Sequence, residues 1–285
     1  MPLVSMEKVL SESVSKKYAV GAFDALDLIT CDAVIAAAED KGVPVIVMIV
    51  DFMLDLPNAD TLMADFVLRC RRAAVPVALH LDHGSSFEAV MKAINHGCTS
   101  VMLDASSLPF DENVALTRKV VDAAHACGVT VEAEIGHVAG HEGNMLDGNV
   151  ADEKFYTTVE QAVRFYKETN VDCLAVAIGT VHGVYKGTPK LDYERLHAIR
   201  KALPIPIVMH GGSGLSAEAF RKAVEFGINK VNFFTGMTLA GADAVRNLLN
   251  SKKKVTMVDI LNVGQKAMYD VVREHLDIFG TLPLE

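Results

Sequence analysis

The amino-acid sequence predicts a (β/α)8 barrel, an α/β fold that here forms a single domain with a helical extension at its C-terminus. Three observations predict it. Short runs rich in Val, Ile and Leu alternate about eight times with helical patterns, as in parallel strands joined by crossover helices. The length of 285 residues is one that such barrels often occupy, so residues 1–285 are expected to form one unit. Polar clusters follow nearly every predicted strand, at the end where barrel active sites lie.

The predicted strands are continuous aliphatic runs. They span residues 19–23, 44–50, 76–82, 100–104, 130–135, 173–178, 206–210 and 230–234. Such runs fit strands that are buried on both faces of a parallel sheet. A doubly wound open sheet would use the same runs and is the main structural alternative. The barrel is favoured because the candidate functional residues gather at the C-terminal ends of the runs.

The predicted helices lie between these strands, and several end at a glycine. They span residues 31–41, 87–95, 113–126, 158–169, 193–203 and 217–226. Gly42, Gly97, Gly128 and Gly227 lie at the ends of four of these segments, where a left-handed glycine commonly terminates a helix. The glycines therefore support both the helices and their C-terminal boundaries.

Two segments break the alternation of strands and helices. Residues 136–154 form a long, polar, glycine-rich loop, and a loop of this length in a compact domain usually has a function. A surface loop without a role is the alternative. Residues 236–249 are predicted to be helical, and residues 257–279 follow a basic loop as the C-terminal helical extension. We expect this extension to pack in an oligomer.

Composition excludes several classes of protein. The net charge of −9 argues against a nucleic-acid-binding protein, but it permits an anionic substrate in a locally positive pocket. No apolar stretch is long enough to span a bilayer, and the N-terminal segment lacks the apolar core of a signal peptide. The five cysteines include no CxxC pair and lie in apolar or helical surroundings, which indicates buried free thiols. We therefore expect a cytoplasmic protein with no membrane partner.

Three histidines are the first candidates for chemistry. His83, His182 and His210 each end a separate apolar run and each precede a glycine. Strand ends converge at one face of a barrel, and three imidazoles with an open position are typical of a catalytic zinc site. A single histidine at a strand end is more often structural, so the hypothesis depends on all three. His80 and His137 are competitors, and His80 is expected in the core or behind the ligands.

Several carboxylates would share this site. Asp82 precedes His83 and is a candidate general acid or base; a supporting carboxylate or a helix cap is the alternative. Glu132 and Glu134 alternate on one strand, so both are expected to face inward, where a carboxylate needs a partner or a metal. Glu134 is a candidate ligand or orients one. Asp104, which belongs to the same inner layer, is also a candidate metal ligand.

Glycines after the seventh predicted strand suggest a phosphate site. Residues 211–214 (GGSG) follow His210 and precede a helix, and main-chain N–H groups at such a turn bind phosphate. Barrels commonly bind phosphate on the loops after strands seven and eight. Asn232 and Thr235 lie at the end of the eighth predicted strand. Lys186 is a candidate cation for the same phosphate, with an exposed loop lysine as the alternative.

Several motifs in order give the sequence a family resemblance. YAVGAF, VALHLDHG, SVMLDAS, VEAEIG, AIGTVHGVYKG, PKLDYERL, HGGSG and KVN cover most of the chain. Together they resemble the class II, metal-dependent fructose-bisphosphate/tagatose-bisphosphate aldolases. The resemblance implies a zinc enzyme that cleaves a ketose phosphate into dihydroxyacetone phosphate and an aldehyde. It also implies a homodimer or a homotetramer.

The resemblance assigns roles residue by residue. His83, His182 and His210 match zinc ligands, and Asp82 matches the acid/base that handles a substrate hydroxyl. Glu134 matches a carboxylate near an alternate metal position. Glu142, in the long loop, matches a glutamate that moves the dihydroxyacetone phosphate proton. The phosphate and a monovalent cation, Na⁺ or K⁺, would lie among Gly183, Lys186, Gly211, Ser213, Asn232 and Thr235.

The sequence also departs from the family pattern. Asp24 replaces the usual Asn after GAF, and residues 50–55 (VDFMLD) replace a turn that usually contains Ser. Residues 233–236 read FFTG in place of the usual small or acidic residue before Thr, and residues 254–262 lack the Arg that can reach a distal phosphate. Tagatose or fructose 1,6-bisphosphate is the default substrate. A deoxy or otherwise modified sugar phosphate is the alternative, because the changes cluster where the aldehyde half should bind.

Two further functions remain open at the level of the sequence. A metal-dependent sugar-phosphate isomerase or epimerase would use the same site without breaking a carbon–carbon bond. A non-catalytic sugar-phosphate-binding subunit would not need Asp82 and Glu142 beside three histidines. The aldolase is favoured by the complete set.

Overall fold

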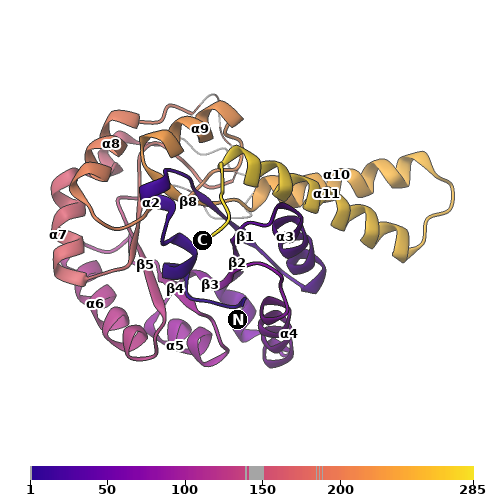
Figure 1. The fold of residues 1–285 in the computed structure, drawn as a ribbon, viewed down its shortest axis with the longest axis horizontal. Helices are drawn as coiled ribbons and strands as arrows, with labels where there is room; N and C mark the ends of the chain where they lie inside the picture. Colours follow the sequence, from indigo (N-terminus) through magenta and orange to yellow (C-terminus); the bar gives the residue numbers. More distant parts are fainter. Residues whose placement is uncertain (1, 139, 141–150, 184, 186, 188) are drawn as a thin grey trace.

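The chain folds as a closed barrel of eight parallel strands (Figure 1), which confirms the predicted fold. The computed structural model describes residues 2–138, 140, 151–183, 185, 187 and 189–285. The strands are β1 (Val20–Asp24), β2 (Val45–Val50), β3 (Val77–Gly84), β4 (Ser100–Leu103), β5 (Thr130–Ile135), β6 (Cys173–Val176), β7 (Ile207–Met209) and β8 (Ile228–Asn232). Each strand pairs with the next, and β8 pairs with β1. This last pairing excludes the open-sheet alternative.

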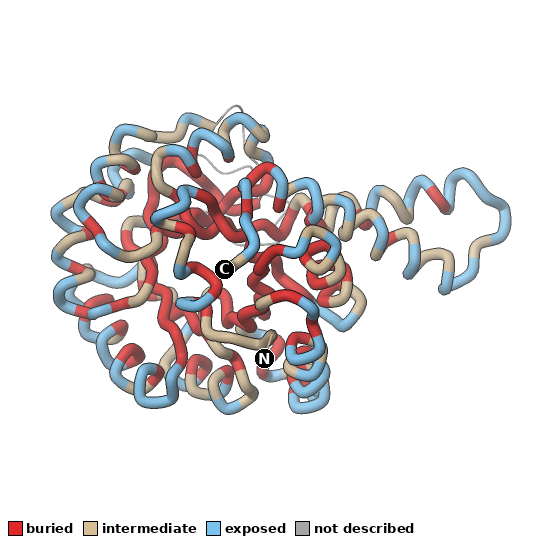
Figure 2. Tube along the Cα trace, in the orientation of Figure 1, coloured by how far each residue is buried: buried red, intermediate tan, exposed pale blue. Residues whose placement is uncertain are grey.

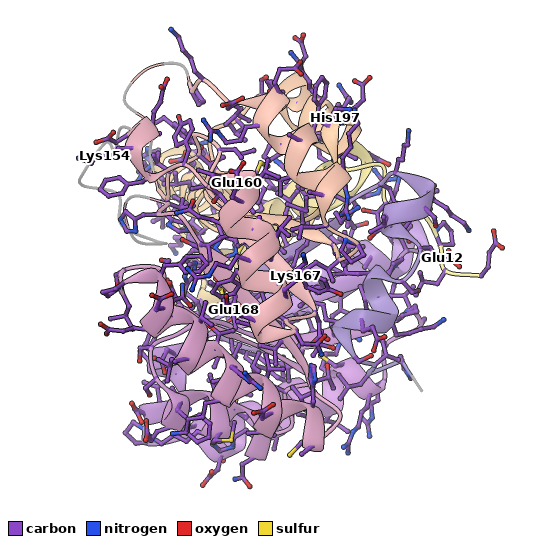
Figure 3. The ribbon with its side chains drawn as sticks, turned by 90° about the vertical axis from the view of Figure 1, so that its left-hand side faces the viewer. Glu12, Lys154, Glu160, Lys167, Glu168 and His197 are labelled. Carbon is purple, nitrogen blue, oxygen red and sulfur yellow. The ribbon has the colours of Figure 1, made fainter. Side chains whose placement is uncertain are left out.

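The helices surround the barrel and protect its strands from water. They are α1 (Met6–Leu10), α2 (Ser13–Lys16), α3 (Leu28–Lys41), α4 (Ala59–Arg71), α5 (Phe87–Asn95), α6 (Phe110–Ala126), α7 (Val159–Thr169), α8 (Tyr193–Ala202), α9 (Ala217–Phe226), α10 (Thr235–Ser251) and α11 (Met257–Ile278), with short 3-10 helices η1 (Asp51–Asp55) and η2 (Glu153–Phe155). In α7, Glu160, Lys167 and Glu168 face outward (Figure 3), whereas Ala162 and Phe165 are buried. This division is the amphipathic pattern of a surface helix.

Three helices were not predicted. The sequence analysis left residues 59–71 unassigned, yet they form α4, whose buried Met63, Phe66 and Cys70 recur at helical spacing. Charged residues between these three obscure the apolar pattern. α1 and α2 precede β1. Met6, Val9 and Leu10 of α1 pack against the interior of the barrel near the amino ends of the strands.

The interior of the barrel changes from apolar to polar along the strands. Near the amino ends, small and aliphatic side chains such as Val20, Ile46 and Ala78 fill the centre with α1. Towards the carboxyl ends the inward positions become polar, and they include fully buried His80, Glu132 and Lys230. The buried trace occupies the centre of the molecule in Figure 2. The polar end of the interior is therefore where chemistry is possible.

The extension predicted at the C-terminus is a helical hairpin. α10 and α11 pack against each other and project well beyond the barrel (Figure 1), and α11 also packs on α3. Leu249, Met257, Val258 and Leu261 are exposed apolar residues of this hairpin. No helix among the described residues is long and apolar enough to cross a membrane.

The cysteines differ from the prediction at one position. All five are free, and four are buried as expected. Cys127 is exposed because it forms the C-cap of α6, where the helix turns towards β5 at the surface. The prediction that every thiol is buried was therefore wrong for Cys127.

Candidate metal centre

His83 owes its position to a break in the strand that carries it. In a regular strand, neighbouring side chains point to opposite faces, so an inward Asp82 would send His83 outward. The pairing of β3 with β4 shifts register between Leu81 and Gly84, and His83 has a φ of 46°. A bulge of this kind redirects a side chain, and the left-handed backbone costs about 1–3 kcal/mol. His83 and Asp82 consequently line the same cavity.

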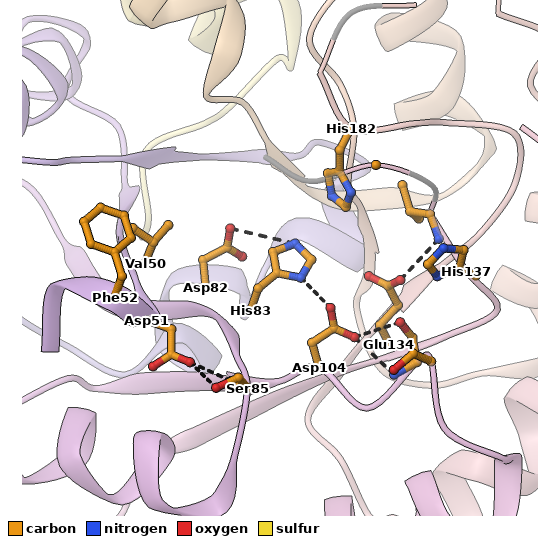
Figure 4. A pocket seen from close by; sticks show the side chains of 14 residues that line it. Val50, Asp51, Phe52, Asp82, His83, Ser85, Asp104, Glu134, His137 and His182 are labelled. Atoms are coloured by element: carbon orange, nitrogen blue, oxygen red, sulfur yellow. Dashed lines mark hydrogen bonds and ion pairs between the residues drawn. The ribbon is translucent and has the colours of Figure 1, made fainter. Parts of the chain in front are cut away.

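The structure brings the three predicted histidines together. His210 directly follows β7, and His182 lies in the loop after β6. The ring centroid of His83 lies 5.0 Å from that of His182 and 4.7 Å from that of His210. One ligand atom from each of the three lies within 4.8 Å of the others. Figure 4 shows His83 and His182 facing each other in the cavity.

These histidines fit a divalent cation. Nε2 of His83 is buried and makes no hydrogen bond, although a buried polar atom normally has a partner. His182 and His210 are also buried. Three converging imidazoles, two of them buried, with room for a further ligand are typical of a catalytic metal centre.

Asp104 holds the ring of His83. Nδ1 of His83 donates to Oδ2 of Asp104 over 2.8 Å, and Ser106 donates to Oδ1 of Asp104 from its hydroxyl and its main-chain N–H. Burial opposes the charge on Asp104, but the hydrogen bond with His83 outweighs it and lowers the pKa of the carboxyl. Burial also opposes the charge on His83, yet Asp82 and Asp104 raise the pKa of the ring well above its ordinary value.

His210 lies between two carboxylates. Its Nε2 is 2.8 Å from Oε1 of Glu132, and its Nδ1 is 3.2 Å from Oε2 of Glu134. Burial works against a charged ring, but the two neighbouring carboxylates raise the pKa of His210 to about 9. Burial, together with the other two histidines, lowers the pKa of His182 well below its ordinary value. The carboxylates thus favour positive charge at this centre.

The remaining predicted ligands lie beside the histidines. His83, Asp104 and Glu134 form a second group of possible metal ligands, again with their atoms within 4.8 Å of one another. Asp82 is fully buried; its Oδ1 accepts from Nδ2 of Asn232 at 2.9 Å, and its Oδ2 lies 4.0 Å from Nε2 of His83. Asn232 therefore fixes Asp82 beside the three histidines. Oδ2 of Asp82 takes no part in the bond to Asn232.

Three of the predicted phosphate residues, Gly211, Ser213 and Thr235, lie just after β7 or at the start of α10. Gly211 has a φ of 69°, and a Cβ there would lie 2.4 Å from the main-chain oxygen of Val181, so this position requires glycine. The hydroxyl of Ser213 accepts from the N–H of Gly236 at 3.1 Å. Thr235 is the first residue of α10 and is buried. These glycines and the helix start form one corner of the site.

Not every predicted residue belongs to that corner. Gly183 is buried in the loop that carries His182. Asn232 lies deeper in the barrel, bonded to Asp82 and to Lys230. Glu142 and Lys186 lie outside the described residues.

A cavity of about 370 Å³ opens beside the histidines. Its wall includes Asp51 and Phe52 of η1, the segment whose sequence departs from the family pattern. Ser85 donates to Oδ2 of Asp51 from both its main chain and its hydroxyl (Figure 4). Four carboxylates line the cavity, and its described lining includes no Lys or Arg.

Sequence reasoning missed some residues of the site. Ser85 and Ser106 line the cavity and were not singled out, since isolated serines near strand ends carry no distinctive signal. Lys230 was also missed, although its place two residues before Asn232 puts both on the inward face of β8. A lysine inside an otherwise buried strand was the available signal.

The chain is similar to known proteins over nearly its whole length. The family model described as fructose-bisphosphate aldolase class-II matches residues 4–282. The chain is 43% identical over 285 residues to a fructose-bisphosphate aldolase of Geobacillus stearothermophilus, covering 99% of this chain and 98% of the relative. It is 39% identical over 290 residues to a fructose-bisphosphate aldolase of Staphylococcus aureus, with the same coverage of 99% and 98%.

Solved structures show the same likeness. The crystal structure of the YdjI aldolase from Escherichia coli K12 superposes with a TM-score of 0.87 at 32% identity, covering 98% of both chains. A fructose-bisphosphate aldolase from Campylobacter jejuni superposes with a TM-score of 0.81 at 23% identity, covering 99% of this chain and 97% of the other, a likeness of fold alone.

Proposed function

Because the chain belongs to the class II fructose-bisphosphate aldolase family of carbon–carbon lyases, we propose that it reversibly cleaves a ketose phosphate into dihydroxyacetone phosphate and an aldehyde. Tagatose or fructose 1,6-bisphosphate is the default substrate. The observation that carries the proposal is the convergence of three histidine ligand atoms within 4.8 Å, beside a buried Asp82. A non-catalytic subunit that only binds a sugar phosphate would not need this arrangement.

His83, His182 and His210 would hold one zinc ion. When bound, zinc supplies Lewis acidity that stabilises negative charge on substrate oxygen. Asp104 orients His83 through the bond to Nδ1 and leaves Nε2 for the metal, as partners of ligands commonly do. Asp104 and Glu134 are also candidates for an alternate metal position, because they form a second ligand group with His83.

Asp82 would move the proton of the substrate hydroxyl. Its Oδ1 is occupied by Asn232, so Oδ2 is the oxygen available to a substrate in the cavity. A general acid or base must lie within hydrogen-bonding reach of the proton that it moves, and Asp82 lines the cavity beside His83. We assign the second proton transfer, at the dihydroxyacetone phosphate carbon, to Glu142 from the family resemblance.

The phosphate of the dihydroxyacetone half would bind at the corner formed by Gly211, Ser213 and Thr235, with Gly183, Asn232 and Lys186 as further candidates. Main-chain N–H groups and the N-terminus of α10 provide the positive end of a helix there. The corner follows strands seven and eight, the usual phosphate position in barrels. A sodium or potassium ion beside it rests on the resemblance alone.

The aldehyde half would bind in the cavity beside η1. The carboxylates of Asp51, Asp82, Asp104 and Glu134 line this cavity, and its described lining includes no Lys or Arg. A second phosphate there would meet like charges, which cost binding energy. We therefore propose that the enzyme either takes an aldehyde other than glyceraldehyde 3-phosphate or binds glyceraldehyde 3-phosphate differently from its family. If the bisphosphates are poor substrates, the substrate is a deoxy or modified sugar phosphate.

The proposal extends to the partners, the location and the oligomeric state of the enzyme. We propose a small-molecule sugar phosphate as its partner, with no nucleic acid and no membrane, and a cytoplasmic location. We also propose a homodimer or homotetramer, supported by the exposed apolar residues of the α10–α11 hairpin.

The test is zinc-reconstituted cleavage of fructose and tagatose 1,6-bisphosphate, with dihydroxyacetone phosphate detected by a coupled reductase. Asp82→Asn should lose at least about 100-fold in kcat while zinc stays bound. Asp111→Asn makes the same chemical change in an exposed ion pair with Arg164 and should leave kcat unchanged. Retention of native kcat by Asp82→Asn would refute the proton-transfer role.

A further inference from the structure

Lys230 is a fully buried lysine at the centre of the barrel. It belongs to β8 and has no exposed surface. Its Nζ lies 2.8 Å from Oε2 of Glu132 and donates to Oδ1 of Asn232 over 2.7 Å. Lysine is almost never fully buried unless it is paired, because removing one charged group from water costs roughly several kcal/mol. Its two partners each contact a different residue of the candidate site: Glu132 contacts His210, and Asn232 contacts Asp82.

The first partner leads to a metal ligand. Glu132 is fully buried, and its carboxylate forms an ion pair with the ammonium group of Lys230, with Oε2 lying 2.8 Å from Nζ. An ionised carboxylate only accepts hydrogen bonds, so Nε2 of His210, 2.8 Å from Oε1, must carry the proton. Nδ1 of His210 is then the ring nitrogen left for a metal. Lys230 thereby fixes which nitrogen can bind.

The second partner leads to the proton-transfer residue. An ammonium group has no acceptor, so the atom of Asn232 that faces Lys230 must be its oxygen. The amide nitrogen of Asn232 is therefore the atom that donates to Oδ1 of Asp82 over 2.9 Å. The amide cannot turn over without losing both bonds. Lys230 thereby also fixes which oxygen of Asp82 remains for substrate.

We infer that Lys230 is a positioning residue that couples the metal centre to the proton-transfer carboxylate. One buried ammonium orients His210 through Glu132 and Asp82 through Asn232, and these four contacts span 2.7 to 2.9 Å. The inference rests on the proposed roles of His210 and Asp82. Lys230 does not touch substrate in this arrangement, since it is fully buried and does not line the cavity.

The experiment compares Lys230→Met with two reference variants. Methionine has a similar length but neither charge nor donor. Thr169→Val is the control, because its buried hydroxyl bonds only main-chain groups of Phe165 and Val171, away from Lys230 and its partners. His210→Ala reports the proposed metal role itself. Zinc affinity by chelator competition, thermal unfolding and kcat at saturating zinc are measured for each.

Lys230→Met should weaken zinc binding by about 10- to 100-fold, the usual effect of losing a partner of a ligand. It should also lower kcat at saturating zinc, whereas Thr169→Val changes neither zinc affinity nor kcat. Native zinc affinity and kcat in folded Lys230→Met would overturn the inference. If His210→Ala also kept native zinc affinity, the proposed metal site would fail instead, so the two failures are distinguishable.

A double variant separates positioning from charge balance. Lys230→Met leaves Glu132 as an unpaired buried charge, and Lys230→Met/Glu132→Gln removes that charge. The double variant should unfold at a higher temperature than Lys230→Met yet keep weak zinc binding and low kcat. Recovery of both functions to native levels would mean that Lys230 only neutralises Glu132, which contradicts a positioning role.

A further test uses the native protein, so its result does not depend on whether a variant folds. NMR of the zinc-loaded protein with isotopically labelled histidine reports which ring nitrogen of each histidine binds metal. His210 should bind through Nδ1 and carry its proton on Nε2. Metal on Nε2 of His210 would break the contact with Glu132 and overturn the inference.

Discussion

Nε2 of His83 lies 4.0 Å from Oδ2 of Asp82, although the two residues are neighbours in one strand. The shift of register between Leu81 and Gly84 and the left-handed φ of His83 make this possible. A proposed metal ligand and a proposed acid/base therefore share one cavity. The bulge in β3 is the structural feature on which the site depends.

Gly84 should be essential to that bulge. A Cβ at Gly84 would lie 2.6 Å from the main-chain oxygen of Met102, so Gly84→Ala must displace β3 or β4. We expect a loss of about 1–3 kcal/mol in the free energy of unfolding and a clear loss of zinc affinity. Gly42→Ala is the control, since its Cβ meets nothing within 4 Å although its φ is 67°. Equal zinc affinities in the two variants would contradict this account.

Asp104 should act through His83. Asp104→Asn weakens the acceptor of Nδ1 and should lower zinc affinity by about 10- to 100-fold, with little change in stability. Asp51→Asn alters another carboxylate of the same cavity, one that bonds Ser85 and no described histidine. Zinc titration should show native affinity for Asp51→Asn only. If both variants bind zinc like the native protein, Asp104 does not support His83.

Asp51 should disfavour anionic aldehydes. Asp51→Asn removes one carboxylate from the cavity wall and should raise the kcat/KM for glyceraldehyde 3-phosphate relative to glyceraldehyde by about fivefold, roughly 1 kcal/mol of repulsion. Condensation with dihydroxyacetone phosphate measures both aldehydes. Asp55→Asn is the control, because that exposed residue of η1 pairs with Lys92 and does not line the cavity. An unchanged ratio in Asp51→Asn would exclude charge as the cause of selectivity.

His80 should make the metal-free protein sensitive to acid. Burial lowers the pKa of His80 to about 3, whereas the unfolded chain titrates near 6.5. Between these values the unfolded state binds more protons, so stability is present above about pH 6.5 and is lost as pH falls, by about 1.4 kcal/mol per pH unit. The free energy of unfolding, measured with denaturant at a series of pH values, should fall more steeply with acid in the native protein than in His80→Gln below about pH 6.5. Above that pH the two curves should run parallel. Parallel curves at low pH would contradict the shift.

The α10–α11 hairpin should form part of an oligomer interface. Val258→Asp places a charge among the exposed apolar residues of the hairpin and should shift the protein towards the monomer in light scattering. Leu68→Asp makes a similar change on α4, at another exposed leucine, and should leave the mass unchanged. A native mass for Val258→Asp would place the interface elsewhere.

Much of the fold was predictable because its signals are local. Thr130–Ile135, Phe87–Asn95 and Ala217–Phe226 match the predicted boundaries, since aliphatic runs and terminal glycines or caps mark them. Predicted strands such as 206–210 run past the observed Ile207–Met209, because the apolar pattern continues beyond the last ladder hydrogen bond. α4 was missed because its charged residues mask a short apolar face.

The site was predictable as a set of residues but not as a network. Three histidines at strand ends predict a metal centre, because a barrel gathers those ends at one face, and the structure brings the three together. The contact of His83 with Asp82 depends on a bulge, and neighbouring residues normally diverge. Asn232 was assigned to phosphate, yet it bonds Asp82 and Lys230, a relationship between strands that spacing along the chain does not encode.

The most direct test is a titration of the chelator-treated enzyme with zinc, in which bound metal and release of dihydroxyacetone phosphate are measured together. The account predicts that activity rises in proportion to bound zinc, reaches its maximum at one ion per chain, and is lost in variants that replace any of His83, His182 and His210 with alanine. Full activity in the metal-free enzyme, or zinc that binds in the triple alanine variant as tightly as in the native protein, would contradict the account.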